Sequence, residues 1–130
     1  MKEPLFLSLD QVIEIHQIQL REYGGQDGVR DQGALESAMA QPESGFGEQF
    51  LHAYPFGMAA AYAFHIAENQ PFIDGNKRTA LNAALAFLEL NGIALDCPGA
   101  QLFQAMIDVG NRHMDKEGLE QVFKSLVSPK

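Results

Sequence analysis

Apolar side chains recur at helical spacing along most of the chain, which predicts an all-α fold. Residues 8–11, SLDQ, form a capping box, in which a serine hydroxyl and a glutamine side chain satisfy free N–H groups at a helix start. The apolar or aromatic positions that follow share one helical face: Leu9, Val12, Ile13, Leu20 and Tyr23. The glycine pair 24–25 ends this helix. Asp31 then caps a short helix that extends to Met39, before Pro42.

Two alanine-rich segments, about 56–69 and 76–90, are apolar on nearly all sides, so we expect them at the centre of the fold. Asn91 and Gly92 close the second segment. Further helices are predicted over residues 98–109 and, with Asp115 as their cap, over 115–127. The fold is therefore predicted to be a bundle of about six helices.

The remaining stretches lack helical spacing. Residues 41–55 have no clear period and are predicted to be a mobile surface loop. Residues 5–7 and 93–95 are short apolar pieces, which we predict to pair as a minimal β ribbon.

Composition narrows the class of protein. At 130 residues the chain is long enough for one hydrophobic core, and we expect a single domain over residues 1–130. A net charge of −8 disfavours direct binding to nucleic acid or anionic membranes. The apolar run 56–67 is shorter than the roughly 20 residues of a membrane span, and residues 1–10 lack the apolar core of a signal peptide. With Cys97 as the single cysteine, we expect a cytoplasmic protein without an internal disulfide.

Residues 70–80, QPFIDGNKRTA, hold the densest chemistry and lie between the two alanine-rich helices. The glycine tolerates the positive φ of a concave row of backbone N–H groups, and a helix that starts at about Asn76 directs its free N–H groups to the same place. Lys77 and Arg78 add positive charge. The carboxylate of Asp74 suits a divalent cation that bridges nucleotide phosphates. These residues predict an anion seat.

Structural interpretations also exist for the polar residues of the motif and for an arginine and histidines outside it. Asp74-Gly75-Asn76 alone is also a common turn with an N-cap, but the basic pair beside it in so acidic a chain favours the anion seat. A P-loop is excluded because GxxxxGK[ST] is absent. Arg30 is predicted to pair with Asp27, Asp31 or a loop carbonyl rather than with a ligand. His16 and His52 are isolated histidines without metal-ligand spacing and are predicted to be structural or solvated. His65 is predicted to be a core or helix-surface histidine.

QPFIDGNKRTALNAALAFLELNG resembles the Fic/Doc superfamily signature HPFxDGNKRTA, and especially its death-on-curing (Doc) branch. The flanking GGQDGVRDQGALESAMAQP and HIAEN look like the same branch. Leu81 stands where Fic members usually carry a second arginine, whereas Asn82 and Lys77 match the Doc pattern. The resemblance implies a bundle of about six helices and a Mg²⁺-dependent transferase of nucleotide phosphate, with phosphoryl transfer favoured over adenylyl transfer.

Carried over by position, the resemblance assigns Asp74 to Mg²⁺ and Gly75, with the backbone of Asn76 and Lys77, to the anion hole. Four side chains would hold the phosphate chain: Asn76, Lys77, Arg78 and Asn82. Phe72 would be the buried pin of the loop. The aromatic residues Phe46, Phe50 and Tyr54 would either clamp a target over the site or anchor their loop on the core. Residues 44–48 only faintly resemble the family's self-inhibitory motif, so inhibition by a separate antitoxin is favoured.

Gln70 occupies the place of the family's histidine, the general base that acts with Asp74 and Arg78. Loss of a positioned base costs a factor of about 10² to 10⁴ in rate, whereas the amide still hydrogen-bonds a hydroxyl or a phosphate. We therefore expect phosphate binding with slow or absent transfer. Both a lineage that lost catalysis and a substitution that permits production of a toxic protein explain Gln70, and the otherwise intact motif favours the second.

The resemblance implies the toxin of a toxin-antitoxin module, which transfers the γ-phosphate of ATP to a hydroxyl of elongation factor Tu and is neutralised by a Phd-type antitoxin. ATP and Mg²⁺ would be its cofactors. A non-catalytic protein that binds nucleotide or antitoxin is the alternative, and an AMP transferase is the third hypothesis.

Overall fold

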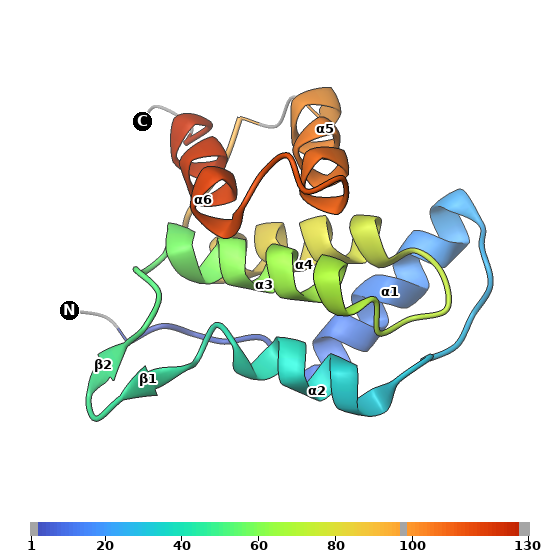
Figure 1. Ribbon diagram of the computed structural model, residues 1–130, viewed down its shortest axis with the longest axis horizontal. Coiled ribbons are helices and arrows are strands. Elements are labelled where there is room, and N and C mark those ends of the chain that lie inside the picture. The colour runs from blue at the N-terminus through green and yellow to red at the C-terminus, as the bar shows by residue number, and fades with distance from the viewer. Residues whose placement is uncertain (1–2, 97–98, 128–130) are drawn as a thin grey trace.

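The computed structural model describes residues 3–96 and 99–127, and over these residues it consists of six helices and one short β ribbon (Figure 1). The elements in chain order are α1 (Leu9–Tyr23), α2 (Gln32–Ala40), β1 (Gly45–Phe46), β2 (Gln49–Phe50), α3 (Phe56–Asn69), α4 (Asn76–Leu90), α5 (Gly99–Gly110) and α6 (Lys116–Ser125). The predicted all-α fold is confirmed.

Helices α3 and α4 form the centre of the fold, as their composition predicts. A short loop joins them, so they lie side by side in opposite directions (Figure 1). α2 packs on α3, and α1 packs on α4. Figure 1 shows α5 and α6 on the opposite side of the central pair. The loop between α3 and α4 is consequently held from both ends by buried helices.

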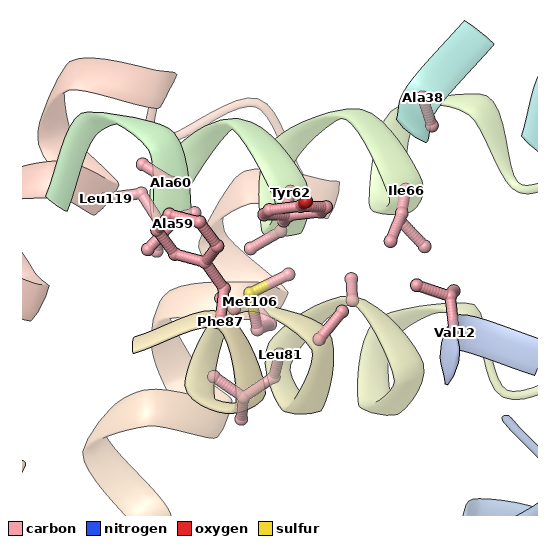
Figure 2. Close-up of a cluster of buried hydrophobic side chains, with 14 of the residues drawn as sticks. Val12, Ala38, Ala59, Ala60, Tyr62, Ile66, Leu81, Phe87, Met106 and Leu119 are labelled. Atoms are coloured by element: carbon pink, nitrogen blue, oxygen red, sulfur yellow. The ribbon is translucent and has the colours of Figure 1, made fainter. Parts of the chain in front are cut away.

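Small side chains let the two central helices approach each other closely. The fully buried alanines are Ala59, Ala60, Ala61 and Ala63 of α3 and Ala80, Ala83 and Ala84 of α4. Between them, the rings of Tyr62 and Phe87 lie 5.2 Å apart and are both buried (Figure 2). The Tyr62 hydroxyl accepts a hydrogen bond from the Leu7 N–H at 2.9 Å, which satisfies this polar group within the core.

The predicted helix starts are confirmed by their caps. The Ser8 hydroxyl accepts from the Gln11 N–H and the Gln11 side chain accepts from the Ser8 N–H, at 3.1 and 2.7 Å. Asp31 and Asp115 cap α2 and α6 through their carboxylates. α6 ends at Ser125, earlier than predicted, because Val127 instead forms a β bridge. The expected start of α5 at Pro98 lies outside the described residues.

The predicted ribbon between residues 5–7 and 93–95 is wrong. The Asn91 side-chain amide pairs with both the N–H and the C=O of Leu5, at 2.9 Å each, in the way a neighbouring strand would. Leu95 pairs with Val127 instead. The β ribbon forms inside the predicted loop, where Gly45 and Phe46 face Phe50 and Gln49. No helix among the described residues is both long and apolar enough to span a membrane.

The start of α6 is attached to α3 through a basic pair. Lys116 Nζ lies 3.1 Å from His65 Nε2, so the neutral ring accepts from the ammonium group. Burial, followed by the charge of Lys116 and the nearby His52, lowers the pKa of His65 to about 4. The unfolded chain therefore binds a proton at this histidine at a higher pH than the folded protein does, and stability is lost as the pH falls from about 6.5 towards 4.

We therefore expect His65→Gln, which keeps a hydrogen-bond acceptor, to flatten this pH dependence. Because solvent reaches the half-buried ring, the parent chain should lose on the order of 1–2 kcal/mol more than the variant between pH 7 and pH 4.5. Urea unfolding at both pH values measures the difference. His113→Gln, at an exposed position, should follow the parent chain. Equal pH dependence of His65→Gln and the parent would contradict the expectation.

Candidate functional site

The motif forms the loop between α3 and α4, and two left-handed residues define its ends. Gln70 ends α3 with φ 46° and ψ 57°, and its N–H donates to the Ile66 carbonyl. Gly75 precedes α4 with φ 78°. The ring of Phe72 lies between these residues in the chain and is 1 % exposed, as expected for the pin of the loop. The chain thus reverses over six residues.

α4 differs from the capped helices at its first turn. Its N-cap residue is Gly75, so no side chain caps the N–H groups of that turn. Serine or aspartate fills this role at α1, α2 and α6. Free N–H groups and the positive end of the helix dipole together favour an anion. This geometry supports the predicted anion seat.

Asn76 fixes the shape of the loop from inside. Its side-chain oxygen accepts from the Phe72 N–H and its amide nitrogen donates to the Phe72 carbonyl, each at 2.9 Å. That the Asn76 side chain holds phosphate stays a prediction. The backbone N–H of Asn76 belongs to the uncapped first turn of α4. Asn82 is likewise bonded locally, since its amide donates to the Arg78 carbonyl at 2.8 Å.

A second segment, residues 25–31, lies along the motif loop. Val29 and Phe72 form a β bridge, and the Ile73 N–H donates to the Gly28 carbonyl at 3.0 Å. The N–H groups of Arg30 and Asp31 both donate to the Pro71 carbonyl. Pairing between segments about 40 residues apart has no local signal, so the sequence does not predict this contact.

Arg30 closes the C-terminal end of α3. Its guanidinium donates to the carbonyls of Gln70 and Asn69, at 2.7 and 2.8 Å. The prediction that Arg30 pairs with a loop carbonyl is confirmed. A cation on the last carbonyls of a helix also offsets the negative end of its dipole. The backbone of Gln70 is thereby held at both its N–H and its C=O.

Asp74 presents an exposed carboxylate beside the free first turn of α4. Oδ1 accepts from the Gly75 N–H at 2.9 Å and Oδ2 accepts from the Gln26 N–H at 3.2 Å. The described residues contain no group of three or more His, Cys, Asp or Glu side chains placed to hold a metal ion. Mg²⁺ typically binds through one or two carboxylates together with substrate phosphates and water, so Asp74 fits that ion when a nucleotide supplies the other oxygens.

The basic residues lie on the first turn of α4. The Arg78 guanidinium is 4.3 Å from the ring centre of Tyr23 and 5.2 Å from that of Phe103, so aromatic rings of α1 and α5 restrict its position. Lys77 extends along the end of α5, where a Cβ atom on Gly110 would lie 2.8 Å from its Cε. Two cations therefore lie on the uncapped first turn of α4 in an otherwise acidic chain.

The histidines take structural positions, as predicted. His65 bonds to Lys116, and His52 lies beside it with a ring-centre separation of 6.5 Å. Burial, ahead of the charge of Lys116, lowers the pKa of His52 as well. His16 is buried on α1 and touches the motif loop, a contact that the isolated histidine did not reveal in the sequence.

The aromatic loop before α3 does not lie over the site. The hairpin and the motif loop are at opposite ends of α3, about 20 Å apart at ~1.5 Å per residue (Figure 1). Phe50 packs edge-on against Phe6, and the Tyr54 hydroxyl bonds to Asn91. These two contacts agree with the anchor alternative, and the distance from the motif loop disfavours the clamp alternative. Phe46 is 92 % exposed, so its side chain does not anchor the loop.

Comparison with known proteins agrees with this arrangement. Residues 6–88 match the Fic/DOC family. The chain belongs to this family. It is 43 % identical over 76 residues to "Toxin Doc" of Mycolicibacterium smegmatis, a match that covers 56 % of each chain. It is 33 % identical over 87 residues to "Protein kinase doc" of Escherichia phage P1, covering 67 % of this chain and 68 % of that protein. Both names agree with the death-on-curing branch.

Gly25 and Gly24 offer a matched test of the Asp74 position. Gly25 has φ 124°, and a Cβ atom there would lie 2.9 Å from Asp74 Oδ2, whereas one on Gly24, at φ 79°, would meet nothing within 4 Å. Both alanine variants should lose about 1–3 kcal/mol of stability through backbone strain. Only Gly25→Ala should also displace the carboxylate and weaken Mg²⁺-dependent nucleotide binding.

Urea unfolding and calorimetric titration with ATP, with and without Mg²⁺, check this expectation. Equal nucleotide affinity in the two variants would show that segment 25–31 does not position Asp74.

Proposed function

We propose that this chain is a Doc-type toxin of a toxin-antitoxin module, built to transfer the γ-phosphate of ATP to a hydroxyl of a translation factor such as elongation factor Tu. The observation that carries the proposal is the uncapped first turn of α4 beside the Asp74 carboxylate and the Lys77–Arg78 pair. Family membership and a relative named as a protein kinase support it.

In this proposal the phosphates of ATP occupy the anion seat. The N–H groups of Asn76 and Lys77 donate to phosphate oxygens, while the Gly75 N–H holds the Asp74 carboxylate beside them. Arg78 and Lys77 neutralise the charge that spreads over the phosphates. Asn82 lies one turn further along the same helix and helps to hold the phosphate chain. Asp74 would hold Mg²⁺, which would supply positive charge to the phosphates.

Gln70 is the reason for proposing that transfer in this chain is slow. The acceptor hydroxyl must lose its proton as its oxygen bonds to the γ-phosphorus and the bond to ADP breaks. The side chain of Gln70 is exposed, and its amide orients a hydroxyl but has no basic lone pair that takes the proton. Position 70 then offers no basic side chain for the proton, which supports an impaired enzyme with preserved binding.

Gln70 also suits a second function, that of a non-catalytic binding protein. Because binding groups are present and the base is absent, the chain also suits a non-catalytic role in which the fold binds a nucleotide or an antitoxin of the Phd type. In either role we place the protein in the cytoplasm, where ATP and a translation factor are found.

A labelling experiment separates these functions. The parent chain and Gln70→His are incubated with elongation factor Tu and with ATP labelled at either the γ or the α position. We expect γ label on the factor, at a rate about 10² to 10⁴ times higher with Gln70→His than with the parent. Gln70→Asn, which introduces no base, is the matched control and should resemble the parent.

Other outcomes point elsewhere. Label from the α position would identify an AMP transferase, and no label from either position with retained Mg·ATP binding would identify a binding protein. A Gln70→His chain that neither phosphorylates the factor nor arrests growth when expressed would overturn the proposed kinase toxin.

A further inference from the structure

A buried histidine of α1 makes two contacts with the motif loop. His16 is 1 % exposed, and its ring stacks on that of Phe72 with 3.8 Å between centres and 9° between planes. Its Nε2 lies 2.8 Å from the Asp74 carbonyl oxygen. A carbonyl only accepts, so Nε2 carries the proton and donates. The loop is therefore tied to α1 through both its buried pin and its backbone.

The bond to the Asp74 carbonyl sets the direction of one peptide group. In a trans peptide the C=O and the following N–H point in opposite directions. With the Asp74 carbonyl held against α1, the Gly75 N–H must point away from α1, and it meets Asp74 Oδ1 at 2.9 Å. A reversed peptide would turn the carbonyl towards the site and withdraw this donor.

We propose that His16 is a positioning residue, which fixes the Asp74–Gly75 peptide so that the anion seat and the metal carboxylate keep their geometry. The inference takes its ligand, Mg·ATP, from the proposed function. The orientation of the Asp74–Gly75 peptide itself does not depend on which ligand binds. His16 does not touch the reacting atoms. It acts through the carbonyl of Asp74 and through the position of Phe72.

His16 and Leu20 are two α1 residues whose side chains lie near Gly75, and they differ in whether the side chain can donate to the Asp74 carbonyl. Gly75 lies in van der Waals range of the ring, since a Cβ atom there would be 3.7 Å from both Cδ2 and Nε2 of His16. Leu20, one turn later on α1, approaches the same glycine with a methyl group at 3.8 Å from that Cβ position. Of these two side chains on α1, only that of histidine has an N–H that can donate to the Asp74 carbonyl.

Two substitutions separate the donor from the stacking. His16→Phe keeps an aromatic ring against Phe72 and removes the donor, whereas His16→Gln removes the ring and keeps an N–H at a similar reach. Glu14→Gln, on an exposed position of the same helix, is the control. Calorimetric titration with Mg·ATP, well below the melting temperature of each variant, measures binding by folded protein only.

We expect His16→Phe to raise the Kd for Mg·ATP about tenfold, the factor that loss of one hydrogen bond produces, and His16→Gln to stay within about threefold of the parent. In the ligand-free protein, nuclear magnetic resonance should show a shifted Gly75 amide with faster hydrogen exchange in His16→Phe, but not in His16→Gln. Glu14→Gln should match the parent in both measurements.

A purely structural role gives a different result, in which both His16 variants melt earlier while Mg·ATP affinity and the Gly75 amide stay as in the parent. That result would overturn the inference. If the parent itself does not bind Mg·ATP, the proposed function fails, and the Gly75 amide alone decides the inference. An unchanged amide in His16→Phe then refutes it, and a shifted amide restored in His16→Gln supports it.

Discussion

The candidate site depends on how a six-residue loop satisfies its backbone polar groups while leaving the first turn of α4 without a side-chain cap. Buried N–H and C=O groups without partners are costly, so this loop needs donors and acceptors from outside its own hydrogen-bonding range. The Asn76 side chain bonds to the N–H and C=O of Phe72, and the His16 ring donates to the Asp74 carbonyl. The Arg30 guanidinium donates to the last carbonyls of α3. Side chains from α1, from residues 25–31 and from α4 thus hold one short loop. The N–H groups that no side chain caps are those of the first turn of α4, where the proposed function places a phosphate.

The contrast between helix starts carries functional information. At the starts of α1, α2 and α6, the side chains of Ser8, Asp31 and Asp115 each accept from a backbone N–H of the first turn. α4 has a glycine at its N-cap and carries two adjacent cations in its first turn. The net charge of the whole chain is −8, so this pair of adjacent cations is a local exception to its overall charge.

Local signals in the sequence predict most of the fold. Capping residues, glycine stops and alanine-rich stretches placed all six helices, because each depends on residues within one turn of the boundary. The pairing of segment 25–31 with the motif loop and the contact of His16 with Asp74 join residues 40 to 58 positions apart, and no periodicity encodes such contacts. The ribbon failed for the same reason, since Asn91 took the backbone groups of Leu5 that a strand was expected to bind.

The proposed separation of nucleotide binding from phosphate transfer rests on position 70. A left-handed backbone is uncommon outside glycine, and histidine adopts it several times more readily than most residues, so this site suits the histidine of the family signature. Gln70 keeps φ at 46° because Ile66 and Arg30 hold its N–H and its carbonyl from both sides. These bonds involve only the backbone of residue 70. Under the proposed function, a change from histidine to glutamine there would remove the proton acceptor, while the loop and the proposed anion seat keep the backbone bonds that shape them.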